Sequence, residues 1–87
     1  TYPLRAAEGA VELNPEDGEA HRLLGWAHLQ SNRRQAAIEA LSRSVELTPD
    51  SGEAHFLLGQ ALKASGEIER AQQTLTRAAN LGYHSDP

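Results

Sequence analysis

The sequence predicts an all-α fold of tandem helix–turn–helix units that stack into a short right-handed α-solenoid. The first observation is a repeat: "GEAHRLLGWAHLQ" begins at Gly18 and "GEAHFLLGQALKA" begins 34 residues later, at Gly52. Residues 14–47 and 48–81 agree at 14 of 34 positions without a gap. The second observation is that apolar residues recur at helical spacing, with no period-2 alternation. Self-similarity at this period is the mark of stacked-repeat architectures.

The predicted helices follow from spacing and from the residues that interrupt it. Helices are expected over 18–31 and 52–65, which contain no proline. "SNRR" and "SGE" then interrupt the pattern with turn residues. "NPEDG" and "TPDSG" end each unit, because proline cannot continue a helix while Asp and Ser can cap the next one. Gly82 suits a left-handed helix end after Leu81. The remaining helices are predicted over 3–13, 35–47 and 69–81.

Composition limits the class of protein. The chain has 87 residues, 8 Lys and Arg against 12 Asp and Glu, and no cysteine. This acidic balance lacks the positive field that a phosphate-backbone binder needs, so nucleic acid is not an expected partner. No run of 18 apolar residues is present, so no membrane span is expected. The absence of cysteine fits a reducing compartment, and a soluble, cytoplasmic chain is favoured. Because the chain starts at Thr1 and contains no Met, we expect a processed product or, in preference, a segment cut from something longer.

The repeat resembles the tetratricopeptide repeat, a 34-residue helix–turn–helix unit. The Leu-Gly pair of that family matches Leu24-Gly25 and Leu58-Gly59, and its small residue opening the second helix matches Ala37 and Ala71. The resemblance implies a single repeat domain over 1–87. Within it, 3–13 is the second helix of a partial leading repeat, and 18–51 and 52–85 are full repeats.

The sequence departs from the family pattern at several places. His21 and His55 stand where a large aromatic is expected, His28 and Leu62 replace a tyrosine, and Tyr83 replaces a closing proline. One subclass of the family clamps the terminal carboxylates of chaperone tails with a Lys followed one turn later by an Asn. Here Arg22 and Trp26 occupy those positions, and the clamp is absent.

The residues that differ between equivalent positions of the two repeats predict a binding face. Along the first helix of each unit, the retained residues, Leu23 among them, share the side expected to pack, and the changed residues share the other side. The resemblance implies that first helices line a concave groove, so we expect the changed side to bind a protein or peptide segment. The only Trp and Phe lie on it, although both could instead pack within the protein. The predicted groove residues are Glu19, Arg22, Trp26, Leu29, Gln30, Glu53, Phe56, Gln60 and Lys63, with Ala64 beside them.

No catalytic, metal or cofactor site is predicted. His21 and His28 are two helical turns apart, too far to share one tetrahedral ion, and His55 and His84 add no recognised ligand motif. The serines mark turns and caps, and the glycines are spread at repeat spacing rather than in a phosphate-binding loop. A non-enzymatic chain without a cofactor is expected.

Two functions remain open from the sequence. The first is a protein–protein interaction scaffold whose concave groove takes a partner segment. The second is a structural module that self-associates or spaces domains in a larger protein, because repeat cores are buried only between neighbours. On the second interpretation a homodimer forms through the end helices, with Ile68, Leu75, Ala78 and Ala79 of the last helix covered by another repeat or another chain.

Overall fold

The computed structural model describes residues 2–83, with side chains from Leu4 onward, and within them the chain is built from helices alone. Every helix end differs from its predicted position by at most one residue, so the all-α prediction is confirmed. Residues 84 and 85, placed in the second repeat by the sequence, lie outside the described part, as does His84. The helices are α1 (Tyr2–Leu13), α2 (Gly18–Gln30), α3 (Arg34–Leu47), α4 (Gly52–Ala64) and α5 (Ile68–Asn80).

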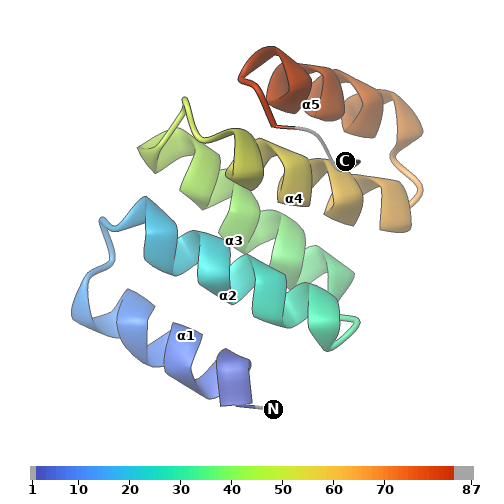
Figure 1. Cartoon of the computed structure of the whole chain (residues 1–87). Helices are drawn as coiled ribbons and strands as arrows, with labels where there is room; N and C mark the ends of the chain where they lie inside the picture. Colours follow the sequence, from blue (N-terminus) through green and yellow to red (C-terminus); the bar gives the residue numbers. More distant parts are fainter. Residues whose placement is uncertain (1, 84–87) are drawn as a thin grey trace.

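The helices stack in chain order, each against the next (Figure 1). Besides these sequential contacts, α2 touches α4 directly, whereas among residues 2–83 α1 does not contact α3 and α3 does not contact α5. Helices on the inside of a curved stack lie closer together than those on the outside. The array therefore curves with α2 and α4 on its inner side and α1, α3 and α5 on its outer side.

The turns between helices are set by local side-chain chemistry. Asp17 and Ser51 cap α2 and α4, accepting hydrogen bonds from the backbone N–H groups of Glu19 and Ala54. Asn32 and Gly66, equivalent in the two repeats, both adopt positive φ angles, and so does the predicted Gly82. The backbone N–H of the residue after each one bonds to a carbonyl five residues back, which closes the helix end.

Two glycines bring each first helix against the helix that follows it. A Cβ built on Gly25 would lie 2.3 Å from Leu41 Cγ, and one built on Gly59 would lie 2.5 Å from Leu75 Cδ2. Leu41 is fully buried. Gly25 and Gly59 therefore lie where a first helix approaches the following helix closely. The continuous core contains Ala37, Ile38, Leu41, Leu58, Ala61, Leu62 and Ala71.

His21 and His55 hold the loops that join the repeats. His21 Nε2 lies 2.9 Å from the carbonyl oxygen of Pro15, and His55 Nε2 lies 2.9 Å from that of Pro49. A carbonyl can only accept, so Nε2 carries the proton in both rings. The two residues therefore do more than fill a vacated aromatic position, because each one ties its helix to the preceding loop.

We expect Gly25→Ala to destabilise the chain by about 1–3 kcal/mol, because the new methyl group would overlap buried Leu41. Gly9→Ala in α1 is the matched control: nothing lies within 4 Å of its Cβ position. There the loss of glycine from a helix should stabilise by roughly 0.5–1 kcal/mol. Urea unfolding followed by circular dichroism measures both, and equal effects of the two substitutions would contradict the close-packing argument.

Candidate functional site

The exposed side of α2 and α4 carries most of the predicted groove residues. We call this surface the inner face, because it lies on the inner side of the curve. Its residues are exposed, and the Trp26 side chain, near the middle of α2, is 38% exposed. The helices keep these residues in line because positions three and four apart share a side. The inner face comprises Glu19, Trp26, Gln30, Glu53, Gln60, Lys63 and Ala64.

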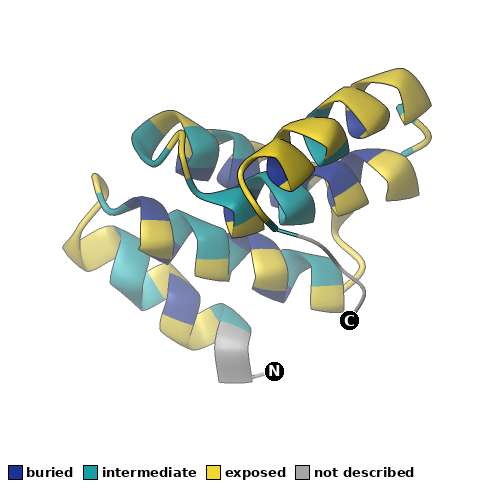
Figure 2. Ribbon diagram, turned by 45° about the horizontal axis from the view of Figure 1, so that its top comes forward, coloured by how far each residue is buried: buried dark blue, intermediate teal, exposed yellow. Residues whose placement is uncertain are grey.

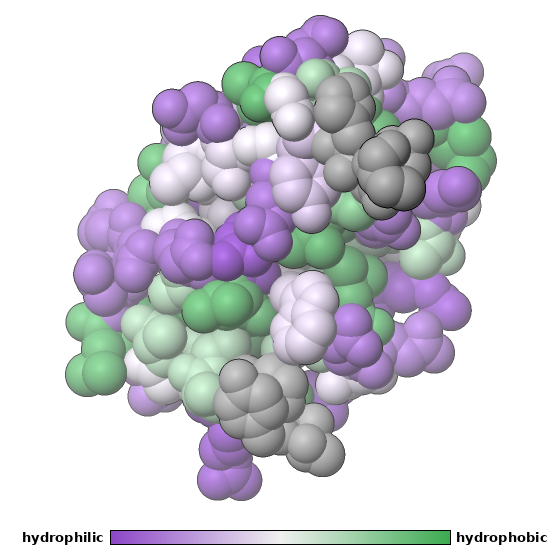
Figure 3. All heavy atoms as spheres, in the orientation of Figure 1, coloured by the Kyte–Doolittle hydropathy of each residue, from purple (hydrophilic) through white to green (hydrophobic). Residues whose placement is uncertain are grey.

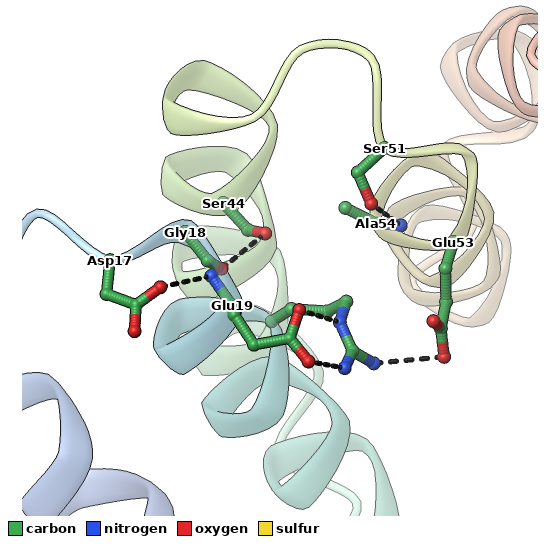
Figure 4. A network of polar contacts seen from close by, with 8 residues as sticks. Asp17, Gly18, Glu19, Ser44, Ser51, Glu53 and Ala54 are labelled. Atoms are coloured by element: carbon green, nitrogen blue, oxygen red, sulfur yellow. Dashed lines mark hydrogen bonds and ion pairs between the residues drawn. The ribbon is translucent and has the colours of Figure 1, made fainter.

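Arg22 lies between the two helices of the inner face and is only 14% exposed. Its guanidinium donates hydrogen bonds to both carboxylate oxygens of Glu19, and donates across to Glu53 Oε2 at 2.9 Å. Figure 4 shows Glu19 and Glu53 directed toward the same guanidinium from α2 and α4. The hydrogen bonds to Glu19, with the charge of Glu53, raise the pKa of Arg22 against the opposing effect of burial. Arg22 thereby links the two repeats.

Leu29 and Phe56, predicted as groove residues, take part in packing instead. Leu29 is partly buried against the core cluster. The Phe56 ring lies half-buried on Tyr83, with ring centroids 5.1 Å apart. Tyr83 stands where the family pattern expects proline, and its aromatic ring covers the side of α4 that faces away from α2. Both side chains lie at the edge of the inner face and contribute little surface to it.

The sequence wrongly assigned Leu23 to the packed side of α2. The Leu23 side chain is 42% exposed, although its repeat equivalent, Leu57, is packed against the core cluster. Leu57 lies one turn after Glu53, which pairs with Arg22 of α2, whereas within residues 2–83 no first helix precedes α2. Leu23 and Leu57, although identical and equivalent in the repeat, therefore have different environments. The signal that could have revealed this is the position of α2 as the first helix of its type in the chain.

The inner face offers shape and polarity rather than reactive chemistry. Figure 3 shows a hydrophilic band across the middle of the molecule bordering a hydrophobic patch over α1 and α2. A surface with an exposed indole, primary amides and an ammonium group can hold an extended peptide through packing and hydrogen bonds. Within residues 2–83 no three His, Cys, Asp or Glu side chains are grouped to hold a metal ion. No helix in this range is long and apolar enough to cross a membrane.

His28 is a titratable residue whose environment, like that of Arg22, shifts its pKa. Its Nδ1 atom is buried without a hydrogen-bond partner in the described part of the chain. Burial, reinforced by the nearby charge of Arg33, lowers the pKa of His28 against the weaker opposing influence of Glu8 and Glu39. The equivalent Leu62 is fully buried. His28 therefore occupies a packing position, and its imidazole is not directed toward the inner face.

Comparison with known proteins agrees with the geometry. A family model described as tetratricopeptide repeat matches residues 4–52 and, in a second overlapping match, residues 24–85. Together the two matches extend over the whole helical array. A search of curated proteins gave no match.

Replacing Arg22 by Gln should destabilise the chain by about 1–2 kcal/mol, because the substitution leaves two neighbouring carboxylates without their shared, largely buried cation. Arg43→Gln is the control: Arg43 pairs with Glu46 but is 43% exposed, so its loss should cost at most about 0.5 kcal/mol. Thermal unfolding at low and high salt distinguishes the two variants. A cost for Arg22→Gln no larger than that of the control would contradict the inter-repeat link.

His28 should make the chain less stable in mild acid. Its folded pKa lies below its ordinary value, so the unfolded chain binds the proton more readily. The stability that neutral His28 allows is complete above about pH 6.5 and is lost as the pH falls through the folded-state value. His28→Leu, which copies Leu62, should raise the unfolding midpoint most at pH 5. Unfolding curves from pH 5 to 8 measure this, and an equal gain at every pH would refute it.

Proposed function

The chain belongs to the tetratricopeptide repeat family, whose repeats generally mediate protein–protein interaction, and we propose that its inner face binds an extended segment of a partner protein. In this proposal the full repeats are 18–51 and 52–85, and 3–13 belongs to a partial leading repeat. The proposed binding residues are the exposed residues of the inner face, which differ between the repeats except for Glu19 and Glu53. The family is typically non-enzymatic, and we propose no catalytic role for these residues.

The observation that carries this proposal is the exposure of Trp26. Exposed large apolar side chains elsewhere in residues 2–83 are explained by helix ends or by a missing neighbour, as for Leu13, Ile68, Leu81 and Leu23. Trp26 lies in mid-helix, and its repeat equivalent, Gln60, is also exposed although α4 has a first helix beside it. This position is therefore exposed on α4, which follows another first helix, as well as on α2. A tryptophan held there is a strong anchor for a partner.

The surroundings of Trp26 indicate what the partner segment offers. An apolar or aromatic side chain would pack on the indole, and the amides of Gln30 and Gln60 suit hydrogen bonds to a peptide backbone. Arg22 is engaged by Glu19 and Glu53, so a partner carboxylate has to compete with two internal ones. Lys63 remains exposed and appears in no ion pair found within residues 2–83. We therefore propose that recognition centres on an apolar side chain rather than on a terminal carboxylate.

Self-association is the second candidate, favoured by the 89% exposure of Leu13 and the 49% exposure of Ile68 at opposite ends of the stack. The outer side of α5 gives it little support. Ala78 is fully buried within the chain, and Figure 2 shows the outward side of α5 as almost continuously exposed. The residues on that side are polar, namely Glu69, Gln72, Gln73, Thr76, Arg77 and Asn80.

We expect Trp26 fluorescence to be red-shifted and freely quenched by acrylamide at every protein concentration, because the indole lies on an open face. The signal is unambiguous since the chain has one Trp. A spectrum that is blue-shifted at high concentration and reddens on dilution would instead mean that a second chain covers Trp26. Trp26→Gln, which copies Gln60, should leave the free energy of unfolding within about 0.5 kcal/mol of that of the original chain. The same substitution should abolish capture of peptides selected from a random library on the original chain.

A further inference from the structure

We infer that the segment bound by the inner face carries one lysine or arginine close in sequence to the apolar side chain that packs on Trp26, and that this cation lies against the carboxylates of Glu19 and Glu53. This partner chemistry rests on the proposed function, because it describes the segment that binds at the same surface. Two features carry it: the arrangement of charge around Arg22 and the distance from there to Trp26.

Arg22 is the most deeply buried member of the ion-pair network between α2 and α4. Its side chain is 14% exposed, whereas that of Glu19 is 64% exposed and that of Glu53 is 47% exposed. The two carboxylates converge on the guanidinium from α2 and from α4 (Figure 4). A molecule that approaches the inner face therefore meets carboxylate oxygens in preference to the guanidinium.

The same network carries an excess of negative charge. One guanidinium is shared by two carboxylates, so one negative charge is left over. Within residues 2–83, the side-chain hydrogen bond found at Glu53 is the one that Oε2 accepts from Arg22 at 2.9 Å, which leaves Oε1 able to accept another. An ammonium or guanidinium group is the complementary donor, because it supplies several N–H groups and the opposite charge.

Trp26 places the apolar contact at a short distance from these carboxylates. On α2 it follows Arg22 by one helical turn and Glu19 by two, which is about 6–10 Å along the helix at roughly 1.5 Å per residue. An extended segment advances about 3.3 Å per residue. About two or three residues therefore separate the side chain over Trp26 from the one that reaches Glu19 or Glu53.

The opposite end of the inner face opposes a second cation. Lys63 lies in the last turn of α4, ten residues after Glu53 and thus about 15 Å further along the helix. Arg33, just after the end of α2, is also exposed. A further lysine or arginine of the partner would face like charge there. The inner face is therefore acidic near the start of its helices and basic near their ends.

The test removes one charge from each side of the complex. Peptides are selected on the original chain from a random linear library, and those whose binding is lost with Trp26→Gln are kept. Glu53→Gln leaves Arg22 and Glu19 as a neutral pair. Glu69→Gln, on the outer side of α5, is the matched control, because it removes the same charge away from the inner face. Replacing the basic residue of the peptide by glutamine gives a second arm that does not depend on the folding of any variant.

We expect the Trp26-dependent peptides to share a basic residue about two or three positions from an apolar one. Glu53→Gln and the peptide substitution should each weaken binding about three- to tenfold, and both together should cost little more than either alone. Glu69→Gln should leave the affinity unchanged. Fluorescence anisotropy of a labelled peptide measures these dissociation constants, and added salt should weaken the original complex more than the doubly substituted one.

Trp26-dependent peptides that lack the basic residue, or that bind Glu53→Gln as tightly as the original chain, would overturn the inferred chemistry and leave the proposed function intact. Enrichment of acidic residues at the same spacing would also overturn it, because a partner carboxylate would then have displaced Glu19 or Glu53 from Arg22. A selection that yields no peptide dependent on Trp26 would overturn the proposed function as well.

Discussion

The fold depends on the contact of a glycine in each first helix with a leucine of the helix that follows. At Gly25 and Gly59 a Cβ atom would overlap the side chain of Leu41 or Leu75, so the absence of a side chain allows the helices to pack closely there. Close approach within each unit leaves room for only small residues around the leucine, and Ala37 and Ala71 are accordingly buried. The interior is thus made mainly of alanine and leucine, and a short chain without aromatic core residues still packs densely.

The surface that we propose for partner binding depends on the approach of α2 to α4. Because α2 and α4 approach one another while the outer helices do not, their remaining exposed sides form one surface. Arg22 links the two helices through ion pairs, because its guanidinium contacts Glu19 on α2 and Glu53 on α4. The inner face is therefore a relatively rigid platform. Rigid surfaces lose little entropy on binding, so a single aromatic anchor such as Trp26 can contribute substantially to affinity.

The internal repeat explains why so much of the fold could be predicted. Comparing two copies separated the constant residues from the variable ones, and this located the helices, the capping Asp17 and Ser51 and the close-packing glycines. The comparison assumes that equivalent positions have equivalent neighbours, which fails at the ends of a stack. For this reason Leu23 is exposed, whereas the equivalent leucine, Leu57, packs against the core cluster. Phe56 was misplaced because its partner, Tyr83, lies outside the compared helices.

Exposure in a repeat array therefore has two physical sources that must be separated before it is taken as evidence of binding. One is intrinsic to the position: Gln60 is exposed on α4, which follows α2, and Trp26 is exposed on α2, which follows no other first helix within residues 2–83. The other depends on the array: Leu13 is more exposed than its equivalent Leu81, and Leu23 is exposed whereas its equivalent Leu57 packs against the core cluster. Exposure of the first kind does not depend on a preceding first helix, so it suits the reversible partner binding that we propose. The second kind arises at an end of the described array, so by itself it is not evidence of a binding site.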